Sequence, residues 1–321
     1  MERVGNRTSP SDIAVSHRNG VVTHVIRARQ SARKNHTVCS DEPCAVCALS
    51  WLAGVLEAEG TFLKPPPSSL NCPIISFRTT DRDVAELVAT AFGVGVTSNR
   101  KGVHRTEYAA TLKGANAVRL MRELHTMLGE RRGKAITAAL GLYRPPARKL
   151  SHAEAGRIRD RHKQGVAIAQ LARELGVTRQ TIYAIVNERI YRAPPPAPWR
   201  DDLPSLIPAP TDCSLASPAE LSWLAGWVEG EGSFLAPPPS DPRRPRVSAM
   251  TRDLDVIERA ARILDVSPTR HYDRRSRARA WSPLFRVLSC GRRAVELMHA
   301  IDPMMGARRR AQIGQALAAV S

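Results

Sequence analysis

Apolar residues recur at helical spacing in seven stretches of the chain, which predicts a helix in each. The stretches are residues 49–59, 83–92, 115–128, 165–186, 221–229, 255–264 and 293–301. Proline clusters interrupt the pattern at residues 65–67, 145–146, 194–198 and 237–239. Proline removes a backbone donor, so the triplets after residues 64 and 236 are expected to shorten the strands beside them.

An internal repeat dominates the sequence. LSWLAGVLEAEGTFLKPPPS (49–68) and LSWLAGWVEGEGSFLAPPPS (221–240) are identical at fifteen of twenty positions, 172 residues apart. A second pair, AVRLMRELHTMLGERR (117–132) and AVELMHAIDPMMGARR (294–309), follows at an offset of 177. A period this long indicates a duplicated domain. We expect a flexible basic arm over residues 1–47, a first repeat over 48–142 and an insert over 150–192. A Pro-rich linker over 193–217 and a second repeat over 218–321 would follow.

The composition narrows the class of partner. Of the 321 residues, 48 are Lys or Arg and 30 are Asp or Glu, giving a formal net charge of +18. Such a balance favours a polyanionic partner, with nucleic acid ahead of an anionic membrane surface. The chain has no apolar run of membrane-spanning length and no apolar segment near its N-terminus, and its six cysteines are too few for a disulfide scaffold. We expect a soluble, intracellular protein.

The repeated motif predicts a helix over Trp51–Gly60, with Ser50 as its N-cap and Gly60 ending it as a C′ residue. Small residues allow close approach of two helix backbones. The first copy has Ala53, Gly54 and Ala58, and the second has Ala225, Gly226 and Gly230 at the same positions. Gly232 ends the helix of the second copy. If the two helices pack about a pseudo-twofold axis, Glu59 and Glu231 emerge side by side at their C-terminal ends.

Two carboxylates at the negative ends of helices repel each other, and a divalent cation resolves the conflict. Carboxylate and carbonyl oxygens suit Mg²⁺, which points to metal-assisted phosphodiester hydrolysis in a basic protein. The alternative is a pair of solvated helix-end carboxylates. Glu57 and Glu229 are also paired, and we interpret them as structural.

The segments WLAGVLEAEG and WLAGWVEGEG resemble the two signature helices of a single-chain LAGLIDADG homing endonuclease, over roughly residues 48–142 and 218–318. The resemblance implies an α+β fold of two pseudo-symmetric αββαββα repeats that form a DNA-binding saddle. Its sheets would lie in the major groove, and its signature helices over the minor groove.

The resemblance also implies roles for single residues. Glu59 and Glu231 would bind the metals, with the carbonyls of Ala58 and Gly230 as further ligands. Many members have Asp where this chain has Glu. Thr79 and Thr251 align where the family often has Gln, and Arg131 and Arg308 align where it often has Lys.

The implied function is that of a site-specific, double-strand DNA homing endonuclease, dependent on Mg²⁺ or Mn²⁺. It would act as a monomer on a long pseudo-palindromic site, cut across the minor groove and leave 3′ overhangs. We expect it in the cytoplasm, associated with the nucleoid of a prokaryotic or phage-infected cell, without a membrane partner. The alternatives are a catalytically silent transcription regulator with the same two kinds of domain, and an RNA intron maturase.

The insert predicts a helix-turn-helix. Helices are expected over Ala153–Lys163 and Ala167–Leu175, with a turn at Gly176 and a third helix capped by Thr178. The segment resembles the helix-turn-helix modules of recombinases and phage endonucleases, although a helical spacer without DNA contacts would fit the same pattern. The outer face of the third helix carries the expected DNA-contact residues Arg179, Gln180, Thr181, Tyr183 and Asn187.

Basic residues near the predicted strands are further candidates for DNA contact: Lys64, Arg78, Arg100, Lys101, Arg105, Arg274 and Arg277. Zinc at His36, Cys39, Cys44 and Cys47 is considered, but the compressed spacing favours free or buried thiols.

Overall fold

The computed structural model describes residues 14–18, 21–25, 44–100, 106–145, 150–191, 197–210, 216–271 and 283–320. The first repeat runs α1 (Ala45–Glu59), β3 (Gly60–Leu63), β4 (Ile74–Thr79), α2 (Arg82–Phe92), β5 (Thr97–Asn99), β6 (Glu107–Lys113), α3 (Gly114–Leu124) and α4 (Glu130–Leu142). The second runs α10 (Pro218–Glu231), β7 (Gly232–Leu235), β8 (Arg246–Thr251), α11 (Leu254–Ile263), β9 (Thr269–His271), β10 (Leu284–Cys290), α12 (Arg292–Ile301), a 3₁₀ turn (Asp302–Met304) and α13 (Ala307–Ala318).

Each repeat contains a four-stranded antiparallel sheet. The strand orders are β3-β4-β6-β5 and β7-β8-β10-β9, so the strand that follows each signature helix lies at a sheet edge. Both β3 and β7 have four residues and end before a proline triplet, as expected. The predicted α+β fold of two αββαββα repeats is confirmed, and each repeat has one more helix at its end.

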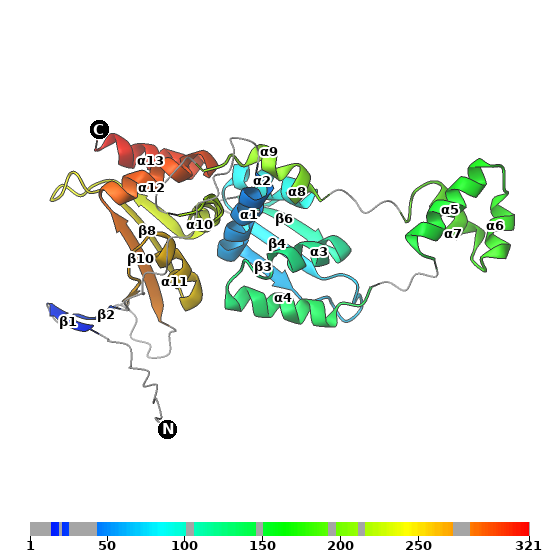
Figure 1. Ribbon diagram of the computed structural model, residues 1–321, viewed down its shortest axis with the longest axis horizontal. Coiled ribbons are helices and arrows are strands. Elements are labelled where there is room, and N and C mark those ends of the chain that lie inside the picture. Colours follow the sequence, from blue (N-terminus) through cyan, green and yellow to red (C-terminus); the bar gives the residue numbers. More distant parts are fainter. Residues whose placement is uncertain are drawn as a thin grey trace, which may run out of the picture.

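The helices α1 and α10 lie side by side between the two sheets (Figure 1). Their backbones touch: a Cβ on Gly54 would lie 2.0 Å from the carbonyl oxygen of Trp223, and a Cβ on Gly226 would lie 2.1 Å from that of Trp51. The two contacts are related by the repeat, so the helices cross about a pseudo-twofold axis. The glycines are required for this approach, since any side chain would separate the helices.

Two details of the predicted signature helices are wrong. The helix α1 starts at Ala45 after Cys44, so Ser50 is buried inside it instead of capping it. In α10 the cap is Ser217, which forms a capping box with Glu220. Gly60 follows α1 with φ −76°, so it is extended and not a left-handed C′ residue. Its lack of a side chain matters because a Cβ would lie 2.4 Å from the oxygen of Leu56.

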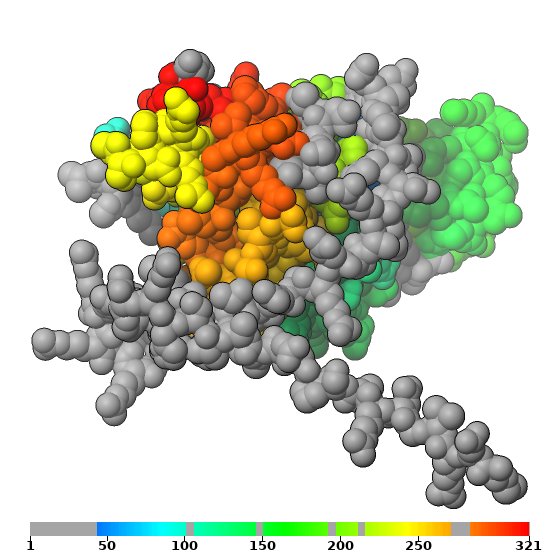
Figure 2. Space-filling view, turned by 60° about the vertical axis from the view of Figure 1, so that its left-hand side comes forward, coloured from blue at the N-terminus to red at the C-terminus, as the bar shows by residue number. Residues whose placement is uncertain are grey.

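The insert folds as a separate three-helix module, set apart from the repeats in Figure 1 and visible at the right-hand side of Figure 2. It consists of α5 (His152–Lys163), α6 (Ile168–Glu174) and α7 (Arg179–Val186), and it has its own apolar core. Gly176 turns the chain with φ +61°, and Thr178 caps α7 by accepting a hydrogen bond from the Thr181 amide. The predicted helix-turn-helix is confirmed.

The Pro-rich segment after the module contains two short helices, α8 (Pro198–Asp201) and α9 (Leu203–Leu206). Trp199 is buried and donates a hydrogen bond to Glu123 of α3, so this part of the segment is packed on the first repeat. In the expected N-terminal arm, β1 (Ala14–Arg18) and β2 (Val21–Val25) form an antiparallel hairpin. Among the described residues, no helix combines the length and apolar character that crossing a membrane requires.

One pair of equivalent tryptophans breaks the symmetry. The Trp51 indole N–H donates to the Met304 carbonyl at 3.1 Å, whereas the equivalent Trp223 N–H is buried without a hydrogen-bond partner among the described residues. The equivalent carbonyl, that of Met127, accepts a hydrogen bond from Arg259 instead. The guanidinium of Arg259 also lies 3.8 Å from the centre of the Trp223 ring. Its counterpart in the first repeat is a leucine at position 87.

We therefore expect two equivalent Trp→Phe substitutions to lower the free energy of unfolding by different amounts. Trp51→Phe and Trp223→Phe both shrink a fully buried side chain, but only Trp51→Phe breaks a hydrogen bond and leaves a buried carbonyl without it. Trp51→Phe should lower the free energy of unfolding by about 1–2 kcal/mol more than Trp223→Phe. Urea unfolding of the two variants measures the difference, and equal losses would contradict the asymmetry.

Candidate functional site

The C-terminal ends of α1 and α10 meet, as expected from the repeated motif. A Cβ on Gly230 would lie 2.6 Å from the Ala58 Cβ and 3.4 Å from the Oε1 atom of Glu59. Glu59 and Glu231 both have exposed side chains. Neither carboxylate has a hydrogen-bond or salt-bridge partner within the described part of the chain, so both are available to a ligand.

Both carboxylates are shifted towards their neutral form. Partial burial raises the pKa of Glu59, and nearby Arg132 opposes this shift. Partial burial also raises the pKa of Glu231, and the charge of Glu59 raises it further. The charge of Glu59 therefore acts on Glu231 in the direction expected for two neighbouring acids.

Two arginines that the sequence analysis missed, the half-buried Arg132 and the buried Arg309, hold the ends of these helices. Arg132 donates to the carbonyl oxygens of Glu57 and Ala58, at 3.3 Å through Nη2. Arg309 donates to those of Glu229 and Gly230, at 2.9 and 3.0 Å. Cations at a helix C-terminus stabilise it. The signal in the sequence was the second arginine of the repeated pairs at 131–132 and 308–309.

The acids Glu57 and Glu229 are structural, in agreement with their interpretation from the sequence. Each residue is 3% exposed, and its side chain accepts a hydrogen bond from a backbone amide at the start of a later helix, Gly129 at 2.6 Å and Gly306 at 2.8 Å. Burial raises the pKa of Glu229 to about 7 and also raises that of Glu57. Both acids tie the signature helix of a repeat to its final helix.

A cavity of about 230 Å³ opens beside Glu59. Its lining includes Thr79 and Asp81 from the first repeat and Gly230 and Arg308 from the second. Thr79 accepts a hydrogen bond from the Asp81 amide, and Thr251 accepts one from the Asp253 amide in the other repeat. Each threonine therefore keeps its own O–H for a ligand.

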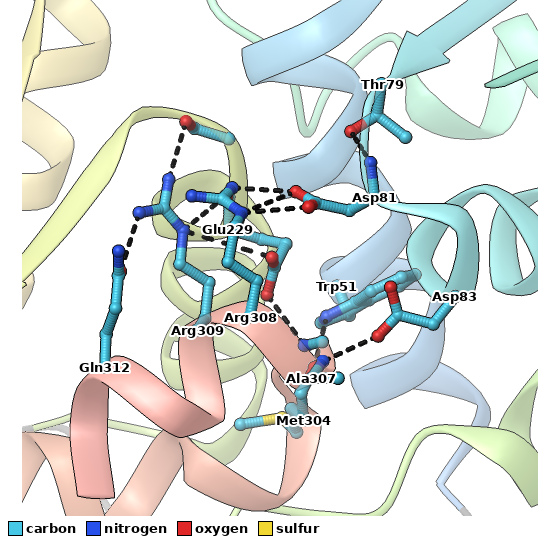
Figure 3. A network of polar contacts seen from close by, with 12 residues as sticks. Trp51, Thr79, Asp81, Asp83, Glu229, Met304, Ala307, Arg308, Arg309 and Gln312 are labelled. Carbon is cyan, nitrogen blue, oxygen red and sulfur yellow. Dashed lines mark hydrogen bonds and ion pairs between the residues drawn. The ribbon is translucent and has the colours of Figure 1, made fainter. Parts of the chain in front are cut away.

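Arg308 and Arg131 are each paired with an aspartate of the opposite repeat. Arg308 contacts Asp81 through Nε at 2.9 Å and through Nη2 at 2.7 Å (Figure 3). Arg131 contacts Asp253 through Nε at 2.8 Å. The sequence analysis singled out both arginines from the family resemblance but did not identify the aspartates.

The other expected DNA-contact residues are only partly described. Arg78 lies on β4 and pairs with Glu107 of β6 at 3.2 Å, and Lys64 and Arg100 are exposed. Four candidates lie outside the described residues: Lys101, Arg105, Arg274 and Arg277.

On the third helix of the insert, the expected contact residues fall into two groups. Arg179, Gln180 and Tyr183 are exposed on α7. Thr181 contacts the cap Thr178, and Asn187 donates to the Tyr183 carbonyl at 2.8 Å.

Only two of the four possible zinc ligands lie within the described residues. His36 and Cys39 lie outside the described residues, Cys44 precedes α1 and Cys47 is buried within it. In the described part of the chain, His, Cys, Asp and Glu side chains nowhere gather in threes as a metal centre.

Comparisons with known proteins give three results. The family described as the helix-turn-helix domain of resolvase matches residues 144–189. The comparison with curated proteins gave no match. Solved structures similar to this chain include the LAGLIDADG homing endonuclease I-GzeII in complex with its DNA target, at 14% identity over 84% of this chain and 89% of that one, with a TM-score of 0.43.

Two further structures are comparable. The meganuclease I-SmaMI bound to uncleavable DNA is 15% identical over 84% of this chain and 90% of that one, with a TM-score of 0.45. The LAGLIDADG homing endonuclease I-LtrWI bound to target DNA is 13% identical over 85% and 90%, with a TM-score of 0.39. Likenesses this low carry no argument about activity. By its repeated motif and its fold, the chain is similar to single-chain LAGLIDADG homing endonucleases, and its insert is similar to the helix-turn-helix domain of resolvases.

Proposed function

We propose that this protein is a site-specific DNA endonuclease that cuts both strands of a duplex and depends on Mg²⁺ or Mn²⁺. The observation that carries the proposal is the pair of exposed carboxylates of Glu59 and Glu231 at the touching ends of α1 and α10, which have no hydrogen-bond or ion-pair partner among the described residues. The formal net charge of +18 supports a polyanionic substrate.

The donor set fits a divalent cation. Two carboxylates with raised pKa values lie close together at two negative helix ends, and added positive charge would relieve their repulsion. Glu59 and Glu231 would hold the ions, with the Ala58 and Gly230 carbonyls beside them. When bound, such ions activate water and stabilise the charge of the leaving oxygen.

The chain's own side chains complete the reaction. A water oxygen forms a bond to phosphorus while the bond between phosphorus and the leaving sugar oxygen breaks. The water gives up a proton to solvent, and the leaving oxygen takes one up from solvent. The exposed guanidinium of Arg308 can bind a non-bridging phosphate oxygen, and the free O–H of Thr79 can orient the water. Arg131 and Thr251 repeat this arrangement in the other half. Because one chain supplies both halves, it acts as a monomer on a long, roughly palindromic site.

The helix-turn-helix extends the contact with DNA. The exposed Arg179 and Gln180 lie at the start of α7, where a recognition helix contacts base edges. The module follows the first repeat in the chain, and it would bind duplex DNA outside the cleavage site.

A second candidate function is that of a DNA-binding regulator that does not cut. It is favoured by one observation: the Ala58 and Gly230 carbonyls already accept hydrogen bonds from Arg132 and Arg309. A carbonyl oxygen has two lone pairs, so the hydrogen bond from the arginine leaves one lone pair for a metal ion.

A cleavage screen tests the proposal. The full chain is incubated with plasmids that carry a randomised insert, at fixed salt, with Mg²⁺ or with EDTA. We expect linear DNA with staggered 3′ ends only when Mg²⁺ is present. A mobility shift without cutting would support the regulator, and a preference for structured RNA would support a maturase.

A further inference from the structure

A second cavity lies between the two repeats, beside the first half of α10. It has a volume of about 360 Å³, and it is lined by the loop that joins α3 to α4 on one side and by α10 and α11 on the other. Trp223 belongs to this lining and precedes Glu231 by eight residues, which is roughly 12 Å along the helix axis. Among the described residues, this cavity shares no lining residue with the one beside Glu59, so the two are separate sites.

Two arginines of α11 bring positive charge to this second cavity. Arg259 and Arg262 both line it, three residues apart on one face of the helix. Arg259 donates to the Met127 carbonyl through Nη1 at 2.5 Å, and its Nε and Nη2 atoms have no hydrogen bond within the described part of the chain. Arg262 is exposed, and it has neither a hydrogen bond nor an ion pair among the described residues. Most donors of the two guanidinium groups are therefore open to a ligand.

The two acids in the lining are used as helix caps. Glu220 accepts the Ser217 hydroxyl at 2.8 Å, and Asp255 accepts the Glu130 amide at 2.6 Å. Neither acid forms an ion pair with an arginine of α11 among the described residues. Burial, followed by the charge of Arg262, lowers the pKa of Arg259 to about 10. An anion bound between the two arginines would relieve this strain on their charges.

The repeat shows that the charged lining is particular to the second half of the chain. The first repeat has uncharged residues at the three equivalent positions, 172 residues earlier: Ala48 for Glu220, Leu87 for Arg259 and Thr90 for Arg262. In the first repeat the Trp51 N–H donates to a carbonyl, whereas Arg259 takes the equivalent carbonyl and leaves the buried Trp223 N–H without a partner among the described residues. A buried donor without a partner lowers stability, and such local losses are typical of functional sites.

We propose that this cavity binds the phosphate group of a small molecule between the guanidinium groups of Arg259 and Arg262. Planar guanidinium groups bind phosphate oxygens through paired hydrogen bonds. The volume of about 360 Å³ suits a small molecule, whereas the DNA backbone would lie at the other end of α10. The site goes beyond the proposed nuclease function and does not depend on it.

Calorimetric titration of the full chain without DNA tests the site. The probes are inorganic phosphate and ribose 5-phosphate, added at a fixed ionic strength that is set with potassium chloride. The double variant Arg259→Leu, Arg262→Thr gives the second repeat the residues of the first at both positions. It should bind each probe at least about 10-fold more weakly than wild type, as expected for the loss of hydrogen bonds to a charged group.

The matched control is Arg293→Ala, which removes an exposed arginine of α12 that pairs with Asp265 and lies outside the cavity lining. It should leave the affinity for both probes within about 2-fold of wild type, as is usual for exposed ion pairs. The double variant should stay folded in a urea unfolding experiment, because leucine at position 259 frees the Met127 carbonyl for the Trp223 N–H.

A second measurement locates the bound phosphate. In chain labelled with 5-fluorotryptophan, the signal that disappears in Trp223→Phe belongs to Trp223. Because Arg259 lies 3.8 Å from the centre of this ring, either probe should shift that fluorine signal in wild type. The same signal should not move in the double variant.

The two probes distinguish the sources of the phosphate. Tighter binding of ribose 5-phosphate would identify the ligand as a phosphate ester, and tighter binding of inorganic phosphate would identify it as the free ion. Unchanged binding in the double variant would place the anions elsewhere on this basic protein and overturn the site. A dissociation constant above about 10 mM for both probes in wild type would also overturn it.

Discussion

Replacing Glu59 with glutamine should abolish double-strand cleavage and leave nicked circular DNA as the end product. Glutamine keeps the size of the side chain but removes the charge that would hold a cation at the end of α1. The strand assigned to this centre should be cut on the order of 100-fold to 1000-fold more slowly, as expected for the loss of a charge-stabilising group. Glu231→Gln should give the complementary nick.

The measurement separates strands on a denaturing gel and compares DNA binding by mobility shift. Glu59 is exposed and lacks a hydrogen-bond partner within the described residues, so its replacement should leave folding and binding close to wild type. Glu130→Gln is a suitable control, because among the described residues this exposed carboxylate has one ion-pair partner, Lys134 on its own helix. If Glu59→Gln still linearises plasmid at the normal rate, Glu59 has no role in cleavage.

The sequence was sufficient to predict the centre of the molecule because the evidence for it is local. Small residues at three positions of a duplicated helix predict close packing, and a glutamate at the end of each copy then has a defined place. The helix-turn-helix was equally accessible, since Gly176 and Thr178 mark its turn and cap within a few residues. The first helix starts earlier than expected. Its start could not be predicted from the sequence, because Cys44 at the N-cap makes no side-chain capping hydrogen bond.

The contacts between repeats were not predictable from such patterns. Asp83 and Ala307 are 224 residues apart, and the sequence of neither indicates that one caps the helix of the other. Hydrophobic periodicity identifies a helix but not the partner of its exposed end groups. The repeat alignment shows that Arg259 stands where the first repeat has Leu87. The effect of Arg259 on Trp223, however, depends on the position of the Met127 carbonyl.

Adding a single methyl group at Gly54 should disrupt the whole assembly. In Gly54→Ala the new Cβ would lie 2.0 Å from the Trp223 oxygen and 2.7 Å from the Trp227 nitrogen, both backbone atoms that cannot rotate away. The helices must move apart by more than 1 Å to reach ordinary contact, which opens gaps along a fully buried interface. We expect a loss of about 3–5 kcal/mol in the free energy of unfolding, or failure to fold.

Gly133→Ala provides the matched control, because this glycine also lies inside a helix, α4, but a Cβ there would meet no atom within 4 Å. Alanine is the better helix former, so the control should be stabilised by up to about 1 kcal/mol. Urea unfolding compares the two variants, and Gly226→Ala should behave like Gly54→Ala because the repeat relates them. Similar stability of Gly54→Ala and Gly133→Ala would show that α1 and α10 are not in backbone contact. The ends of the two helices would then not hold Glu59 and Glu231 together, and the basis for a shared cleavage site would be lost.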